Sequence, residues 1–276
     1  MRRTLLALGA AAVVGMAAGA AQAQLIVGND QSGTSSIYNV NPTTGVATPI
    51  YTGTDTAAKA WGMAYDAANN LLYWNNGGTL FRSPLGPTLV PQNMGQLTFN
   101  GSATNYVALS FANGKLFGTR NITTEAVYDI NLNTLDATIV YQYPSTLDIG
   151  GLDHDATTGK LYGLSDTGPA GLYEVDLVAQ TQTFRAGYPA GQTDIDGLAV
   201  NNGIAYYVTD GPNAGTGAQP FFYIFDIATG TQTGTIPSPF TGSGTFSAAT
   251  WAAIPEPASL SLIAVGALGA LRRRRA

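Results

Sequence analysis

The chain has 276 residues, 34 of them Gly, with a single His, no Cys and a formal net charge of −5 at pH 7. Residues 24–253 contain six Lys and Arg against sixteen Asp and Glu, a net charge of −10, which excludes a nucleic-acid partner because phosphate recognition needs clustered cations. The lack of Cys excludes disulfides and cysteine metal sites, and the 230 residues of this central part suffice for one all-β domain.

Residues 1–23 have the three parts of a secretory signal peptide. Arg2 and Arg3 form a basic start, residues 5–20 are apolar, and the stretch ends on Ala-Gln-Ala. This pattern predicts removal by signal peptidase before Gln24. A retained membrane helix is the alternative, but the apolar run is short, is rich in Ala and Gly, and ends on small residues.

The first segment of the mature chain, residues 25–50, predicts an outer hairpin that lacks an inner strand. Its two strands are residues 36–41 and 46–50, joined by a Pro-Thr-Thr-Gly turn. A strand of the missing type occurs at the far end of the domain, in residues 246–251. We therefore expect the two ends to share one composite sheet, which closes a ring and removes free sheet edges.

The middle of the chain contains four related units, each starting with a strand that carries a small residue. Together with the strand at the far end, these small residues recur every 43 to 51 residues: Gly62, Ala108, Gly151, Gly197 and Ala248. A turn follows in each unit, and its residues suit the positive φ of a tight hairpin: Asn69-Asn70, Asn113-Gly114, Thr158-Gly159 and Asn202-Gly203.

Two further strands complete each unit. The third strand places an aromatic residue before a polar one: Phe81-Arg82, Tyr128-Asp129, Tyr173-Glu174 and Phe225-Asp226. The fourth strand follows another turn. Four strands in 40 to 50 residues are the period of a propeller blade.

The predicted fold is therefore all-β: a β-propeller over residues 24–253, with about five four-stranded blades, closed by the N- and C-terminal strands. Small residues suit the innermost strands because backbones converge near the axis. A β-sandwich or a β-solenoid is the alternative, since short strands with frequent turns produce a similar pattern.

Five carboxylates in the third and fourth units are candidate metal ligands: Asp148, Asp153, Asp155, Asp194 and Asp196. Asp148 and Asp194 precede inner strands, where adjacent blades would bring them together, and Ca²⁺ takes six to eight oxygen ligands. The alternative is structural, because residues 155–159 have the pattern of an Asx turn, and Asp153 and Asp155 share a strand face that would point to solvent. We favour the structural alternative and expect no cofactor.

No catalytic residue is predicted. His154 is the only His, so a His-based metal triad cannot form, and the G-x-S-x-G motif is absent. The phosphate-binding loop and the dinucleotide fingerprint are absent as well.

Six aromatic residues lie in or beside predicted strands: Trp61, Trp74, Tyr106, Tyr162, Tyr206 and Tyr207. They could stack on sugars, but aromatic side chains dominate the packing of β cores, so we predict that they pack between blades. Trp251, in the closing strand, is predicted to be core as well.

The last residues form a tail of three parts. Pro255-Glu256-Pro257 ends the folded domain, because the prolines block a strand or a helix. Residues 258–271 follow without a charge and can form a helix of about 21 Å, shorter than the ~30 Å hydrocarbon core of a membrane. The final cluster is Arg272, Arg273, Arg274 and Arg275, which would stay on the cytoplasmic side.

These features, in this order and at the extreme C-terminus, resemble the PEP-CTERM family of bacterial sorting signals. The resemblance implies that residues 254–276 anchor the chain transiently in the inner membrane until an exosortase removes them. It also implies delivery to the cell surface or extracellular matrix of a Gram-negative type of bacterium that makes exopolysaccharide. The alternative is a C-terminal anchor that is never cut.

We thus expect an exported, non-enzymatic binding scaffold whose candidate partners are exopolysaccharide and surface proteins. The alternative is a calcium-dependent propeller hydrolase or lyase that acts on sugars or lactones. A periplasmic sensor is a third interpretation, but the chain contains no signalling module.

Overall fold

The computed structural model describes residues 23–122, 125–212 and 220–253. Within this part of the chain, no helix has the length and apolar character needed to cross a membrane. The predicted signal peptide, apart from Ala23, and the predicted tail lie outside the described residues, and so do the sorting residues Pro255, Glu256, Pro257, Arg272, Arg273, Arg274 and Arg275.

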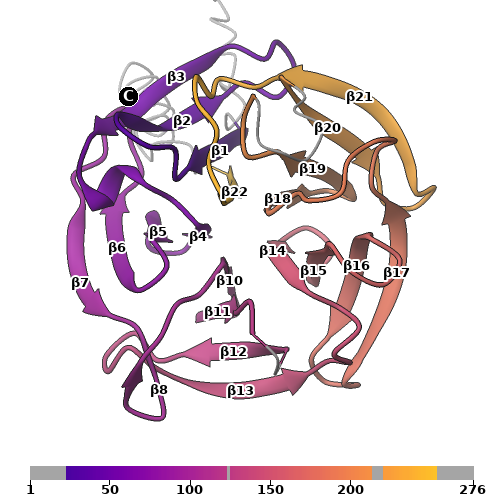
Figure 1. The fold of residues 1–276 in the computed structure, drawn as a ribbon, viewed down its shortest axis with the longest axis horizontal. Coiled ribbons are helices and arrows are strands. Elements are labelled where there is room, and N and C mark those ends of the chain that lie inside the picture. Colours follow the sequence, from indigo (N-terminus) through magenta and orange to yellow (C-terminus); the bar gives the residue numbers. More distant parts are fainter. Residues whose placement is uncertain (1–22, 123–124, 213–219, 254–276) are drawn as a thin grey trace, which may run out of the picture. The chain divides into compact units, whose positions relative to one another are not determined.

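Five antiparallel sheets surround a central axis as the blades of a propeller (Figure 1). Blade 1 contains β22 (Ser247–Ala253), β1 (Ala23–Asn29), β2 (Ser35–Val40) and β3 (Ala47–Gly53), from the axis outward. Blade 2 contains β4 (Gly62–Asp66), β5 (Leu71–Asn75), β6 (Thr79–Pro84) and β7 (Gln92–Gln96). Blade 3 contains β10 (Ala108–Ala112), β11 (Lys115–Thr119), β12 (Ala126–Ile130) and β13 (Asp136–Gln142). Blade 4 contains β14 (Ile149–Asp155), β15 (Lys160–Ser165), β16 (Gly171–Asp176) and β17 (Thr181–Gly187). Blade 5 contains β18 (Gly197–Asn201), β19 (Ile204–Val208), β20 (Phe221–Asp226) and β21 (Thr231–Pro237).

The ring is closed by the two ends of the domain, as predicted. β1 pairs with β22 in a ladder that runs from Ala23 opposite Ala253 to Asn29 opposite Ser247. The expectation of only a hairpin in residues 25–50 was wrong, because β1 precedes that hairpin as the second strand of blade 1. Blade 1 thus joins three N-terminal strands to one C-terminal strand.

Two short elements were not predicted. The 3₁₀ helix η1 (Thr56–Ala58) lies between β3 and β4, and the hairpin of β8 (Thr98–Phe99) and β9 (Ser102–Ala103) lies between β7 and β10. β8 pairs in parallel with β13 and extends blade 3 to six strands. The carboxylate of Asp136 stabilises the hairpin, because it accepts hydrogen bonds from Thr98 Oγ1 at 2.7 Å and from Gly101 N at 3.0 Å.

The inner strands depend on small residues and on tight turns. A Cβ on Gly62 of β4 would lie 2.7 Å from the backbone carbon of Ala108 and from the backbone nitrogen of Leu109 in β10. Glycine is therefore needed where these two backbones meet at the axis. The turn after β10 has φ of 52° at Asn113 and 78° at Gly114, as its sequence predicts.

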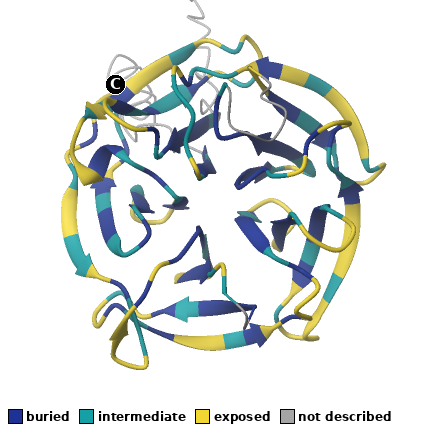
Figure 2. Ribbon diagram, in the orientation of Figure 1, coloured by how far each residue is buried: buried dark blue, intermediate teal, exposed yellow. Residues whose placement is uncertain are grey.

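The hydrophobic core lies between the blades rather than in one central mass. Five clusters of buried side chains each join neighbouring blades, while the outermost strands are largely exposed (Figure 2). Aromatic pairs fill these layers; the rings of Tyr207 and Phe225, for example, stack at 4.4 Å between centroids. Five of the six aromatics predicted to be core are buried: Trp74, Tyr106, Tyr162, Tyr206 and Tyr207. Trp61 is the exception, since it is only half-buried.

Candidate functional site

A cavity of about 420 Å³ lies where the inner strands end, and all five blades contribute to its lining. Each blade supplies residues from the end of its inner strand or from the turn that follows. The lining includes Tyr65, Phe111, His154, Asn201 and Trp251. We call this cavity the axial pocket; its volume is that of a site for a small organic ligand.

Aromatic rings and neutral polar groups line the axial pocket. The half-buried ring of Trp251 stacks on Tyr206 at 5.1 Å, and Phe111 stacks on Tyr73 at 5.8 Å, so both rings are held from behind. Burial lowers the pKa of His154, so its imidazole is neutral at pH 7 and offers one donor and one acceptor. The prediction that Trp251 belongs to the core was correct only in part, because its half-buried ring packs against the core between blades 1 and 5 and also lines the pocket.

Asp153 is buried at the edge of the axial pocket, where it joins three blades. Its carboxylate accepts hydrogen bonds from Val200 N of blade 5 at 2.7 Å and from Thr250 Oγ1 of blade 1 at 3.2 Å. Burial raises its pKa to about 8 despite these hydrogen bonds. The expectation that Asp153 faces solvent was therefore wrong, because the tight packing of inner strands covers both faces of β14.

Asp155 forms the Asx turn that its sequence predicts, but it is fully buried rather than exposed to solvent. Its carboxylate accepts a hydrogen bond from Thr157 N in its own turn at 2.9 Å. It also accepts hydrogen bonds from Asn202 N at 3.1 Å and from Gly203 N at 2.9 Å in the first turn of blade 5. Burial alone would raise its pKa, but these donors outweigh burial, and the pKa is lowered.

A second feature lies at the opposite end of the inner strands, where β14 and β18 begin. Asp166, Asp194 and Asp196 place one carboxylate oxygen each within 4.8 Å of one another. We call these three residues the acidic group. Asp194 and Asp196 come from the predicted set, and burial raises the pKa of all three carboxyls.

The predicted set of five carboxylates is thus divided between two ends of the propeller. Asp148 lies at the start of β14, close enough to Asp194 for the two charges to repel each other. Asp153 and Asp155 lie at the other end of that strand, roughly 17 Å and 23 Å away at about 3.3 Å per residue. One metal ion therefore cannot bind all five carboxylates.

Sequence reasoning missed Asp166, which belongs to the acidic group, and Asp210, which lies beside it. Each follows the second strand of its blade, after Ser165 of β15 and after Thr209 beyond β19. The sequence could not show that the second strand of blade 4 ends beside the first strand of blade 5.

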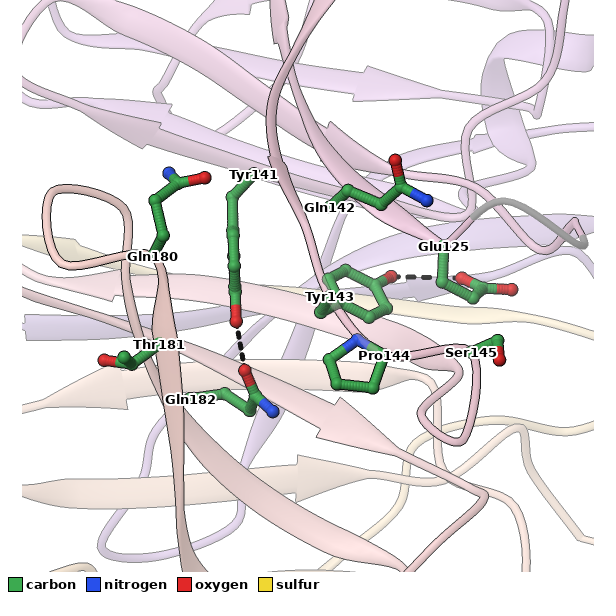
Figure 3. A pocket seen from close by; sticks show the side chains of 9 residues that line it. All are labelled: Glu125, Tyr141, Gln142, Tyr143, Pro144, Ser145, Gln180, Thr181 and Gln182. Atoms are coloured by element: carbon green, nitrogen blue, oxygen red, sulfur yellow. Dashed lines mark hydrogen bonds between the residues drawn. The ribbon is translucent and has the colours of Figure 1, made fainter.

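A second cavity, of about 780 Å³, lies between blades 3 and 4 near the end of β13 (Figure 3). Tyr143 donates a hydrogen bond to Glu125 Oε2 at 3.1 Å, and Tyr141 donates one to Gln182 (Figure 3). Burial raises the pKa of Glu125 to about 7. Only two blades line this cavity, so it lacks the convergence seen in the axial pocket.

Comparisons with solved structures show the fold. A chain in the crystal structure of the Nidogen/Laminin complex matches with a TM-score of 0.57 and 12% identity, over 83% of this chain and 98% of that one. A structural genomics protein of unknown function from Bacteroides thetaiotaomicron matches with a TM-score of 0.50 and 11% identity, over 81% of this chain and 70% of that one. At such identities the likeness concerns the fold alone.

Among known sequences, only the C-terminal tail of this chain gave a match in these comparisons. A search among curated proteins found no match to the chain. Residues 253–275, in contrast, match the family model of the PEP-CTERM protein-sorting motif. This chain therefore joins a five-bladed β-propeller to a C-terminal PEP-CTERM sorting signal, the mark of an exported protein that an exosortase sorts.

Proposed function

We propose that this protein is a non-enzymatic surface scaffold that binds a neutral polysaccharide in its axial pocket. The observation that carries the proposal is the convergence of all five blades on one cavity with half-buried aromatic rings. Stacking on aromatic rings and hydrogen bonds to amides suit the apolar faces and hydroxyl groups of a sugar.

The charge of the pocket supports a neutral ligand. No Lys or Arg occurs among the residues that line the axial pocket, and the domain as a whole is acidic. A polyanionic polysaccharide would meet repulsion there without a compensating cation. The neutral imidazole of His154 and the amide of Asn201 can bind hydroxyl groups without that penalty.

The same pocket gives little support to the alternative of a hydrolase or lyase. Two carboxylates line it, Asp66 and Asp153. Asp66 accepts a hydrogen bond from Asn69 Nδ2 at 2.7 Å in its own turn, and Asp153 holds three blades together. Both carboxylates are thus engaged in structural hydrogen bonds, which favours binding over acid–base chemistry.

For the route to the surface, we propose that signal peptidase cleaves before Gln24 and that an exosortase removes the tail at residues 254–276. Both cuts would spare the closing ladder, because cleavage before Gln24 removes only Ala23 from it and leaves the pairs from Gln24 opposite Ala252 to Asn29 opposite Ser247. Replacement of Pro255-Glu256-Pro257 by three alanines should leave the tail uncut and the chain bound to the cell. Mass spectrometry of the surface fraction measures this, and normal processing of the variant would contradict the sorting role.

Binding is tested with the purified full-length chain in mild detergent, by titration with neutral and acidic bacterial polysaccharides. We expect the neutral polymers to bind, and Phe111→Leu and His154→Ala to weaken that binding at least tenfold. Phe184→Leu is the matched control, because Phe184 is 44% exposed on the outer strand β17. Equal affinity of all variants, or binding of acidic polymers alone, would refute the axial pocket as the site.

A further inference from the structure

Three carboxylates meet at the end of the propeller opposite the axial pocket, in the acidic group defined above. We infer that Asp166, Asp194 and Asp196 form a Ca²⁺ site between blades 4 and 5. This inference does not depend on the ligand of the axial pocket, because the two places lie at opposite ends of β14 and β18.

The spacing of the acidic group fits a calcium ion. Its carboxylate oxygens lie within 4.8 Å of one another, and a central ion at about 2.3–2.6 Å from each oxygen spans that distance. Asp166 and Asp194 are only half-buried, so water can supply part of the six to eight oxygens that Ca²⁺ takes. Mg²⁺ fits less well, because it requires near-ideal octahedral geometry and gives up its water ligands reluctantly.

The protein holds these side chains in place. The carboxylate of Asp166 accepts hydrogen bonds from the Tyr188 hydroxyl at 2.5 Å and from Ile195 N at 3.3 Å. A Cβ on Gly150 would lie 2.3 Å from Asp196 Oδ1, so the absence of a side chain there makes room for the carboxylate. The site is therefore ordered before any ion binds, which lowers the entropic cost of binding.

An independent observation points to a missing cation. Asp210 is only 3% exposed, and its Oδ1 has no hydrogen-bond partner among the described residues. Asp210 lies two residues beyond Val208, which pairs with Gly197 next to Asp196, so the two carboxyl groups are neighbours and their charges repel each other. A buried carboxylate oxygen without a partner is costly, and a nearby divalent ion would offset that cost.

Four of the six basic residues of the domain are engaged elsewhere. The ion pairs among the described residues join Lys115 to Asp129, and Lys160 and Arg185 to Glu174, all away from the acidic group. Arg120 lies over the rings of Phe99 and Tyr128 instead. The neighbour of the acidic group is therefore the carboxylate of Asp210, and none of these four cations pairs with the group.

The test is thermal melting of the purified full-length chain with CaCl₂, with MgCl₂, and with NaCl at equal ionic strength, each before and after EDTA. We expect CaCl₂ to raise the melting midpoint by several degrees, with reversal by EDTA, a smaller effect of MgCl₂ and none of NaCl. Isothermal titration should give one Ca²⁺ per chain.

Two variants locate the site. Asp194→Asn and Asp196→Asn should each abolish the calcium shift, while the matched control Asp176→Asn, at an exposed turn, keeps it. Both variants remove a repelled carboxylate, so their melting midpoints without calcium should not fall, which distinguishes a lost site from a lost fold. The inference would be overturned by a calcium shift that survives both variants or by a shift that NaCl reproduces. It would also be overturned if the unaltered chain showed no shift, in which case protons shared between the carboxyls stabilise the acidic group.

Discussion

Single carboxylates link the blades of this propeller. The carboxylate of Asp155 accepts hydrogen bonds from three backbone N–H groups. Two of these donors, Asn202 N and Gly203 N, belong to the neighbouring blade. The residue therefore acts as a turn former and as a bond between blades at the same time. An ordinary Asx turn such as that of Asp176 has only the first role.

We predict that Asp155→Ala lowers the free energy of unfolding by about 1–3 kcal/mol, because two buried backbone donors of blade 5 lose their acceptor. Urea denaturation measures the change. Asp176→Ala is the control and should cost less, since its carboxylate accepts only from Val178 N and Ala179 N in an exposed turn. Equal losses in the two variants would show that the contact between blades contributes nothing.

Asp153 should make stability depend on pH. Its pKa is raised by burial to about 8, so between about pH 4 and pH 8 the folded state binds a proton that the unfolded state has lost. Stability should therefore fall as pH rises through this range. The measurement is the free energy of unfolding at pH 5 and pH 8, in EDTA. It should fall less for Asp153→Asn than for the unaltered chain or for the control Asp176→Asn. An equal fall in Asp153→Asn would contradict a raised pKa at Asp153.

At the residue scale, the sequence predicted types of side chain better than their surroundings. The turn at Asp155 was predictable from its own neighbours, because an Asx turn is local. The burial of Asp153, the half-exposure of Trp251 and the proximity of Asp166 to Asp194 were not, because each depends on which blades become neighbours. No local pattern contains that information.

Among the elements, the inner strands impose the strictest demands on sequence. The strands β4 and β10 approach so closely that Gly62 has no room for a Cβ. The recurrence of small residues at this place in each unit is the reason that the blades could be counted from sequence. The extra hairpin β8–β9 has no counterpart among the described residues of the other units, so the period could not reveal it.

We predict that Gly62→Ala destabilises the propeller by about 1–3 kcal/mol, because the new Cβ would overlap backbone atoms that cannot move aside. Gly234→Ala in β21 is the matched control: its Cβ would meet Ile224 Cδ1 at an ordinary 3.7 Å. Chemical denaturation of both variants measures the difference. Similar stabilities would mean that the inner strands can separate at no cost.

The molecule as a whole is a ring closed by strands from the two ends of the sequence. β22 gives blade 1 its inner strand, supplies alanines to the cores on both sides, and carries Thr250 to Asp153. The composite sheet was predictable because the N-terminal segment lacked an inner strand with a small residue, and the C-terminal end of the domain had one without further strands of its own. The first strand, β1, was not, since it carries no turn signal of its own.

A chain that ends at Phe246 should therefore fail to fold as a stable monomer, while a chain that ends at Ala253 folds. Loss of β22 exposes the edge of β1 and opens two core layers, so we expect a broad transition or aggregation. Size-exclusion chromatography and circular dichroism melting compare the two chains. A sharp, unchanged transition for the shorter chain would show that four blades and an open ring suffice.

The pairing of the ends also determines how the protein bears mechanical load. Because β1 and β22 are antiparallel and Ala23 lies opposite Ala253, both ends of the domain leave the ladder at the same side. Tension between the two termini would open the ladder like a zipper, one pair after another, instead of shearing all seven pairs together. While the uncut tail anchors the chain by its C-terminus alone, that geometry is avoided. A ligand that pulls on Trp251 then acts two residues from the end of the domain, so we expect the force to bypass most of the ring.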